Sequence, residues 1–202
     1  MEISLLFLPL IASIISGFFG KYIGDRNSEI ITSLFVIVSA LLSISIFYNV
    51  ITNGYENNIV IASWISSGTL NVNWSIKIDP LSSVMLVVVT VISALVHIYS
   101  IGYMTHDPHK PRFMAYLSLF TFAMLTLVTA DNFLQLFFGW EGVGLCSYFL
   151  IGFWFKKDTA NAAAIKAFLV NRVGDFGLAL GIFLIFYLFG TVNYDEVFLK
   201  IP

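Results

Sequence analysis

Six long runs of apolar residues, separated by short polar segments, account for most of the chain. Each run has about the length that a helix needs to cross the hydrocarbon core of a bilayer, roughly 20 residues. The runs do not alternate every second residue over about ten positions, as the strands of a membrane barrel do. The pattern therefore predicts an all-α integral membrane protein with a single membrane domain over residues 1–202 and about six transmembrane helices. The predicted spans are residues 3–20, 30–52, 81–104, 113–130, 132–155 and 162–190.

The connection between the second and third runs has a different pattern. Residues 70–78 alternate between apolar and polar side chains, which is typical of a strand with one covered face. Residues 59–65 precede them across a turn-forming segment at residues 66–69. The pattern predicts a small β-hairpin in this connection, and an ordinary loop is the alternative.

Two aspartates precede predicted membrane helices. Asp79 lies before the third run and Asp131 before the fifth. A carboxylate at a helix start accepts hydrogen bonds from free backbone N–H groups and lies at the positive end of the helix dipole. We therefore expect both residues to cap helices.

The composition fits a protein whose solvent is the lipid bilayer. Of the 202 residues, 58% are hydrophobic and 11% are charged, and the mean hydropathy is +0.90. A soluble domain has roughly a quarter of its residues charged, so this chain lacks the polar side chains to cover a soluble surface. The net charge of −2, without a basic block, argues against a nucleic-acid partner. Cys146 is the only cysteine, which leaves no disulfide and no thiolate cluster for a metal, and we expect it to act as an apolar filler.

The basic residues alternate between successive connections. The first, third and fifth connections contain two Lys or Arg each, whereas the second and the C-terminal segment contain one each and the fourth none. Short cytoplasmic loops retain positive charge, so the odd-numbered connections are expected in the cytoplasm and both termini on the opposite side. The run at residues 3–20 has neither a basic leader nor a small-residue cleavage site, which favours a retained span over a signal peptide.

Glu141 is an ionisable residue at membrane depth. It lies ten residues after Asp131, or about 15 Å along a helix, near the middle of a core roughly 30 Å thick. An isolated charge there costs a few kcal/mol or more. Two interpretations remain open: a proton relay controlled by a nearby cation, and a protonated side chain that hydrogen-bonds between helices. Gly139, Gly142 and Gly144 reduce side-chain bulk around it, either for helix packing alone or for a bend at the site.

Four further residues are candidates for proton transfer. Arg172 and Asp175 are three positions apart, so they share a helix face and compensate one another. Lys166, nearer the cytoplasmic end, either joins them or extends to the lipid headgroups. His97 either titrates as a relay member or is a hydrogen-bonded structural histidine. The proton-transfer candidates are thus Glu141, Asp175, Arg172, Lys166 and His97, and we expect no catalytic residue and no metal site.

Several segments resemble the chain 5 (L) subunit family of respiratory complex I, the proton-translocating NADH:quinone oxidoreductase. The resemblance covers nearly all 202 residues, and together the segments are specific to the antiporter-like superfamily. Their length favours complex I over the related multisubunit cation/proton antiporters and membrane-bound hydrogenases. The segments are DPLS at residues 79–82, VHIYSIGYM at 96–104, DNFLQLFFGWEGVG at 131–144 and KAFLVNRVGD at 166–175.

The resemblance implies roles for the charged residues. Glu141 matches the family's key glutamate on the fifth helix, whose partner is a lysine on a seventh helix, and Arg172 and Asp175 match sixth-helix residues that tune that pair. It also implies a subunit without flavin, iron–sulfur or quinone site of its own, because NADH and quinone are handled by other subunits. Those other complex I membrane subunits are the expected partners, in a bacterial plasma membrane or a mitochondrial inner membrane.

The chain departs from the family in length. A full family member is about three times as long, and the seventh-helix lysine has no counterpart within the 202 residues. We therefore expect a fragment, a truncated product or one half of a split subunit, with a separate chain supplying the later helices. The expected function is half of a proton channel. A cation/proton antiporter subunit and a degenerate paralogue that acts at most in assembly remain as alternatives.

Overall fold

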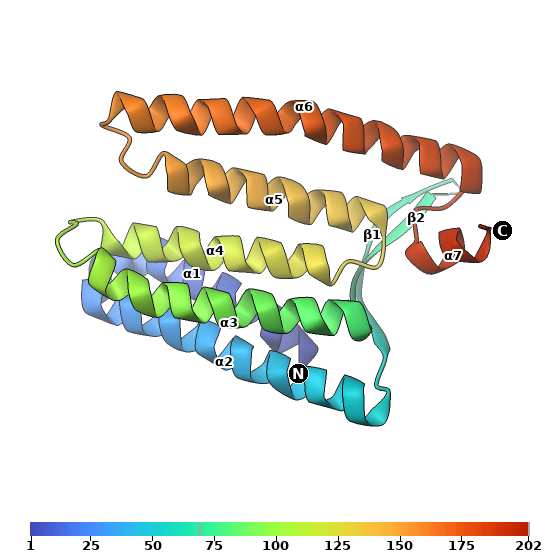
Figure 1. Cartoon of the computed structure of the whole chain (residues 1–202), viewed down its shortest axis with the longest axis horizontal. Helices are drawn as coiled ribbons and strands as arrows, with labels where there is room; N and C mark the ends of the chain where they lie inside the picture. Colours follow the sequence, from blue (N-terminus) through green and yellow to red (C-terminus); the bar gives the residue numbers. More distant parts are fainter. Residues whose placement is uncertain (69, 202) are drawn as a thin grey trace.

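The computed structural model describes residues 1–68 and 70–201; Thr69, in the predicted hairpin turn, and Pro202 lie outside the described residues. Six long helices, a two-stranded sheet and a short terminal helix follow one another along the chain (Figure 1). All six long helices are apolar and long enough to cross a membrane, which confirms the predicted fold class. The elements are α1 (Glu2–Ile23), α2 (Asp25–Asn53), β1 (Asn57–Ser67), β2 (Leu70–Ile78), α3 (Pro80–Tyr103), α4 (Lys110–Val128), α5 (Phe133–Ile151), α6 (Asp158–Phe189) and α7 (Tyr194–Leu199).

Helix starts follow local sequence signals, with one correction. The Asp79 carboxylate accepts a hydrogen bond from the Ser82 N–H, and the Ser82 hydroxyl accepts one from the Asp79 N–H, a capping box that confirms the expected cap of α3. The expected cap by Asp131 is wrong. Asn132 caps α5 through the Gln135 N–H, because α5 begins one residue later than a cap at Asp131 requires. The Asp131 carboxylate instead accepts from the side-chain amide of Asn58.

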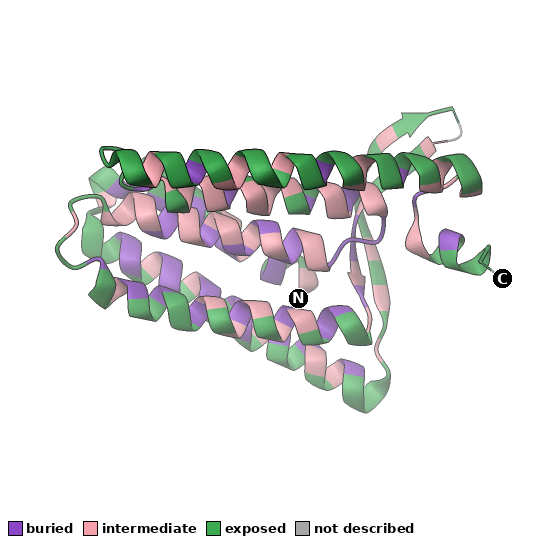
Figure 2. Cartoon of the chain, turned by 45° about the horizontal axis from the view of Figure 1, so that its top comes forward, coloured by how far each residue is buried: buried purple, intermediate pink, exposed green. Residues whose placement is uncertain are grey.

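The long helices pack as neighbours in a bundle with α4 at its centre. Helix α4 packs against α1 on one side and α5 on the other, while α2 packs against α1 and α3. Helix α6 packs mainly against α5, so most of its length is exposed (Figure 2). In a bilayer this exposed surface contacts lipid or further helices, and the α5–α6 contact positions the ionisable residues.

The predicted β-hairpin is present. Strands β1 and β2 pair antiparallel, with two register irregularities in β1 that bend the ribbon. The hairpin is anchored to α5 by the buried Gln135, whose side-chain oxygen accepts from the Ser75 N–H at 2.9 Å and whose amide donates to the Ser75 carbonyl at 2.7 Å. An ion pair between Lys77 and Asp195 joins β2 to α7. The hairpin therefore connects α5 and α7 at one end of the bundle.

The two ends of the bundle differ in charge. The α1–α2, α3–α4 and α5–α6 connections gather at one end, and the hairpin and α7 lie at the other (Figure 1). A hydrogen bond from the Tyr55 hydroxyl to Glu2 also places the N-terminus beside the hairpin. The end with the three connections, here called the basic end, carries six Lys or Arg and four Asp or Glu. The hairpin end carries two Lys or Arg and six Asp or Glu.

Candidate functional site

Helices α5 and α6 bring three ionisable side chains together at membrane depth. Glu141 lies eight residues after the start of α5, or about 12 Å along the helix, and Asp175 lies 14 residues before the end of α6, or about 21 Å. Both positions are well inside membrane spans. Since Arg172 lies one turn from Asp175 on α6, it reaches both carboxylates.

Arg172 is shared between the two acids. Its Nη1 forms ion pairs with Glu141 and, at 3.5 Å, with Oδ2 of Asp175. The guanidinium carbon lies 4.3 Å from the centre of the Phe168 ring, a cation–π distance. The structure therefore joins Glu141 to the Arg172–Asp175 pair and forms one charged cluster, defined here as Glu141, Arg172 and Asp175.

The two acids of the charged cluster have different surroundings. Asp175 is nearly buried, with 9% of its side chain exposed, and its Oδ1 accepts a hydrogen bond of 2.8 Å from the Trp140 indole N–H. Glu141 is more open, with 23% of its side chain exposed. Asp175 is thus fixed by two partners, while Glu141 is held by Arg172 and is the more accessible carboxylate.

The charged cluster has one more acid than base. With both carboxylates ionised, its net charge is −1. An uncompensated charge in a bilayer interior costs several kcal/mol, whereas a proton on one carboxyl leaves a neutral cluster.

A cavity of about 490 Å³ lies beside the cluster. Trp140 of α5 and Asn171, Gly174 and Asp175 of α6 line it, together with apolar side chains. A water molecule occupies about 30 Å³ in the liquid and needs polar partners to stay in a protein cavity. This cavity offers both the room and the polar groups for water next to Asp175.

Glycines allow α5 to pack closely against α4. A Cβ atom on Gly139 would lie 2.7 Å from backbone atoms of Leu127, and one on Gly142 would lie 3.1 Å from Cβ of Ala123. Gly144 has no such neighbour within 4 Å. The expected close helix approach is confirmed for Gly139 and Gly142, and it fixes the rotation of α5 that directs Glu141 towards α6.

The remaining two candidates lie elsewhere. His97 is completely buried between α3 and α4, where Nδ1 lies 2.8 Å from the Ser93 carbonyl and Nε2 lies 3.0 Å from the Ser118 hydroxyl. Lys166 is exposed on α6. Within the described part of the chain, neither residue forms a hydrogen bond or ion pair with the charged cluster, so their roles in proton transfer stay predictions.

Two residues of the site were not predicted. Trp140 holds Asp175, and Phe168 packs against Arg172. A sequence signal existed for each. An indole N–H at membrane depth has no water to donate to and therefore requires an acceptor, and Phe168 precedes Arg172 by four residues, one helical turn. In residues 1–68 and 70–201, no three His, Cys, Asp or Glu side chains form a group that could hold a metal ion.

Two family models match the chain. Residues 64–114 match the N-terminus of chain 5 of NADH-ubiquinone oxidoreductase (complex I), and residues 130–201 match the transmembrane region of the NADH:quinone oxidoreductase/Mrp antiporter family. The second model contains the whole charged cluster.

Related proteins carry corresponding names. The chain is 54% identical over its full length to NADH-ubiquinone oxidoreductase chain 5 of Chondrus crispus, of which it covers 30%. It is 50% identical over its full length to NADH-quinone oxidoreductase subunit L of Rickettsia bellii, of which it covers 32%. The chain thus spans about 30% of the length of the curated relatives that it matches.

Solved structures show the same fold. A chain of the archaeal membrane-bound sulfane sulfur reductase superposes with a TM-score of 0.84 at 19% identity, over 99% of this chain and 40% of that one. A chain of the Mrp complex from Dietzia superposes with a TM-score of 0.80 at 24% identity, over 97% of this chain and 20% of that one.

The membrane helices, the charged cluster and these matches define the class as antiporter-like membrane subunits. Within that class, the chain belongs to the chain 5 (L) family of NADH:quinone oxidoreductase subunits and corresponds to the N-terminal part of its members.

Proposed function

We propose that this chain is part of a proton-translocating membrane subunit of an NADH:quinone oxidoreductase, and that the charged cluster holds the translocated proton. The observation that carries the proposal is Arg172 shared between two carboxylates inside a membrane span. The names of the relatives supply the complex and its reaction. The chain contributes half of a proton channel, and NADH and quinone are handled by other subunits.

Proton binding follows from competition for Arg172. While Arg172 pairs with Glu141, its positive charge stabilises the ionised form of the Glu141 carboxylate. A proton on Glu141 removes that attraction, and Arg172 then pairs with Asp175 alone. Trp140 keeps Asp175 in place, so Arg172 shifts towards a fixed acceptor. Lys166 and His97 are further proposed transfer positions, Lys166 towards the basic end and His97 between α3 and α4.

The proposed setting is a bacterial plasma membrane or a mitochondrial inner membrane, with the basic end in the cytoplasm or matrix. The unequal charge of the two ends supports this orientation. The exposed length of α6 supports contact with other helices, from neighbouring membrane subunits or from a separate chain that supplies the later helices.

The test is Glu141→Gln in membranes shown to contain the chain, with NADH-driven proton uptake as the readout. Glutamine keeps the size of the side chain but cannot carry the proton, so proton movement through this chain should fall by roughly 100-fold or more. The matched control, Glu56→Gln, changes an exposed glutamate near the hairpin and should leave pumping unchanged. Unchanged pumping in Glu141→Gln would refute the proton-transfer role and favour a degenerate subunit that acts in assembly.

A cation/proton antiporter subunit is the second candidate. The matched transmembrane model covers Mrp antiporters as well as quinone oxidoreductases, and the Mrp complex shares the fold. Proton movement that depends on sodium or potassium, in a purified complex that does not oxidise NADH, would favour this candidate.

A further inference from the structure

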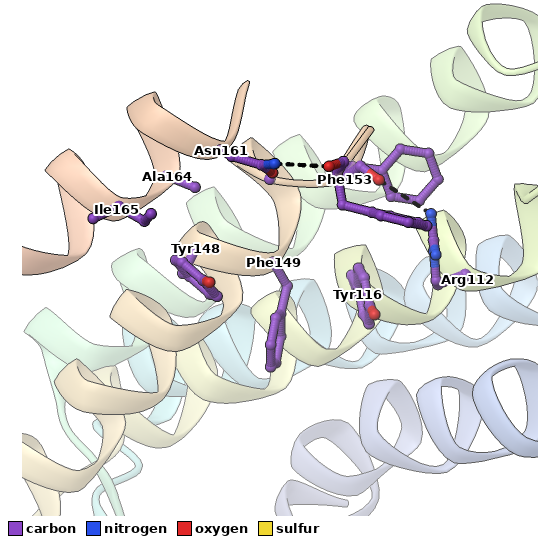
Figure 3. A pocket seen from close by; sticks show the side chains of 10 residues that line it. Arg112, Tyr116, Tyr148, Phe149, Phe153, Asn161, Ala164 and Ile165 are labelled. Atoms are coloured by element: carbon purple, nitrogen blue, oxygen red, sulfur yellow. Dashed lines mark hydrogen bonds between the residues drawn. The ribbon is translucent and has the colours of Figure 1, made fainter. Parts of the chain in front are cut away.

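A second cavity, of about 430 Å³, opens at the basic end of the bundle, away from the charged cluster. It lies between the start of α4, the end of α5 and the start of α6 (Figure 3). Its walls are mainly aromatic and apolar, and one cation lies at its edge. The lining includes Arg112, Tyr116, Tyr148, Phe149, Asn161 and Ile165.

Arg112 is incompletely paired. Its Nη2 donates to the Phe153 carbonyl at 3.1 Å, and its guanidinium packs on the rings of Phe153 and Phe155 at 4.6 and 5.2 Å. Its Nε–H is buried and has no acceptor in residues 1–68 and 70–201. A buried donor without an acceptor costs about 1–3 kcal/mol. Because Nε itself is covered, an acceptor from outside the described chain would reach the guanidinium through its Nη atoms.

No carboxylate in the described chain forms an ion pair with Arg112. Asp107 lies near enough to be influenced by its charge, but the Asp107 oxygens accept from the Trp154 indole and the His109 N–H. Lys110 is paired with Glu29, but the nearby α5–α6 connection adds positive charge through Lys156 and Lys157. An anion at Arg112 would therefore meet an attractive field with an unmatched cation at its centre.

The position of the cavity suits a lipid. Arg112 lies in the first turn of α4, where the helix enters the membrane, at the level of lipid headgroups. The hydroxyls of Tyr116 and Tyr148 have no hydrogen-bond partner in the described residues, and the Asn161 amide already donates to the Phe155 carbonyl. Phe149 and Ile165 supply apolar walls beside these polar groups.

We propose that this cavity binds an anionic phospholipid, with its phosphate on Arg112 and the Tyr116 hydroxyl and the start of an acyl chain along Phe149 and Ile165. The unmatched guanidinium selects the phosphate, and the apolar walls select a molecule with an acyl chain over a free anion. The site is independent of proton transfer at the charged cluster.

The test uses the protein purified from its membrane in the form in which it occurs there, in nanodiscs that contain phosphatidylglycerol and phosphatidylcholine. Native mass spectrometry then counts the retained lipids. The expected result is a preference for phosphatidylglycerol of roughly tenfold or more. Arg112→Gln should abolish this preference, and the control Arg26→Gln, which changes an exposed arginine at the start of α2 that does not line the cavity, should retain it.

A second variant separates lipid binding from folding. Ile165→Trp fills the cavity from its exposed side and leaves Arg112 and its bond to Phe153 intact, so it should also lose the bound lipid. The proposal is overturned if both variants keep the preference or if the unchanged protein shows none. It is equally overturned if inorganic phosphate alone displaces the lipid at millimolar concentration, or if a cross-linker at position 165 captures another helix in the cavity.

Discussion

Replacement of Arg172 by glutamine tests the charged cluster most directly. The substitution removes the cation that pairs with both Glu141 and Asp175 and leaves two carboxylates without their shared partner. A charge-assisted contact contributes about 1.5–3 kcal/mol, and loss of one partner from a fully buried pair costs about 3–5 kcal/mol. Because 37% of the Arg172 side chain is exposed, the expected loss is at the lower end, about 2–4 kcal/mol.

The assay is thermal unfolding of the purified protein, with NADH-driven proton uptake measured in parallel in membranes that contain the chain. For a chain of this size, about 2–4 kcal/mol corresponds to a fall in the melting temperature of about 5–10 °C. Arg26→Gln, which removes an exposed arginine at the start of α2, is the matched control and should shift the midpoint by no more than about 1–2 °C. Proton uptake should fall in Arg172→Gln and stay unchanged in the control.

A double substitution separates the ion pair from general damage. With Arg172→Gln and Glu141→Gln combined, one uncompensated carboxylate is removed, so part of the lost stability should return. Additive losses would show that the two side chains do not interact in the membrane. A single Arg172→Gln variant as stable and as active as Arg26→Gln would refute the shared-cation argument altogether.

Three further predictions concern other parts of the chain. Gln135→Leu removes both hydrogen bonds to β2, so the hairpin should become sensitive to protease, with a loss of about 2–4 kcal/mol in thermal unfolding. Gly139→Ala forces a Cβ against α4 and should destabilise by about 1–3 kcal/mol, whereas Gly144→Ala, with open space, should be neutral or slightly stabilising by the same assay. Asp107 has a lowered pKa: partial burial opposes ionisation, but hydrogen bonds from Trp154 and a backbone N–H outweigh it. The stabilising effect of ionised Asp107 should therefore be complete above the unfolded pKa of about 3.9 and be lost as the pH falls through the lower folded pKa. The difference in melting temperature from Asp107→Asn should shrink over that range and vanish in stronger acid.

The sequence by itself determined the membrane helices and the hairpin. Hydrophobic runs and two-residue alternation are local properties, and a bilayer leaves a long apolar run few options other than a helix. The capping box at Asp79 was predictable for the same reason, because its partner lies three residues away. Local rules failed at Asp131, where the neighbouring Asn132 takes the cap and frees the carboxylate for the hairpin.

Only the tertiary structure decided which polar groups meet. Spacing alone paired Arg172 with Asp175, but the contact of Arg172 with Glu141 depends on how α5 and α6 are rotated against each other, which the close α4–α5 packing at Gly139 helps to set. The bond from Trp140 to Asp175 spans 35 residues, and that from Gln135 to β2 spans 60. Such contacts depend on helix rotation and on the path of the connections, and a periodicity of 3.6 or 2 residues carries no information about either.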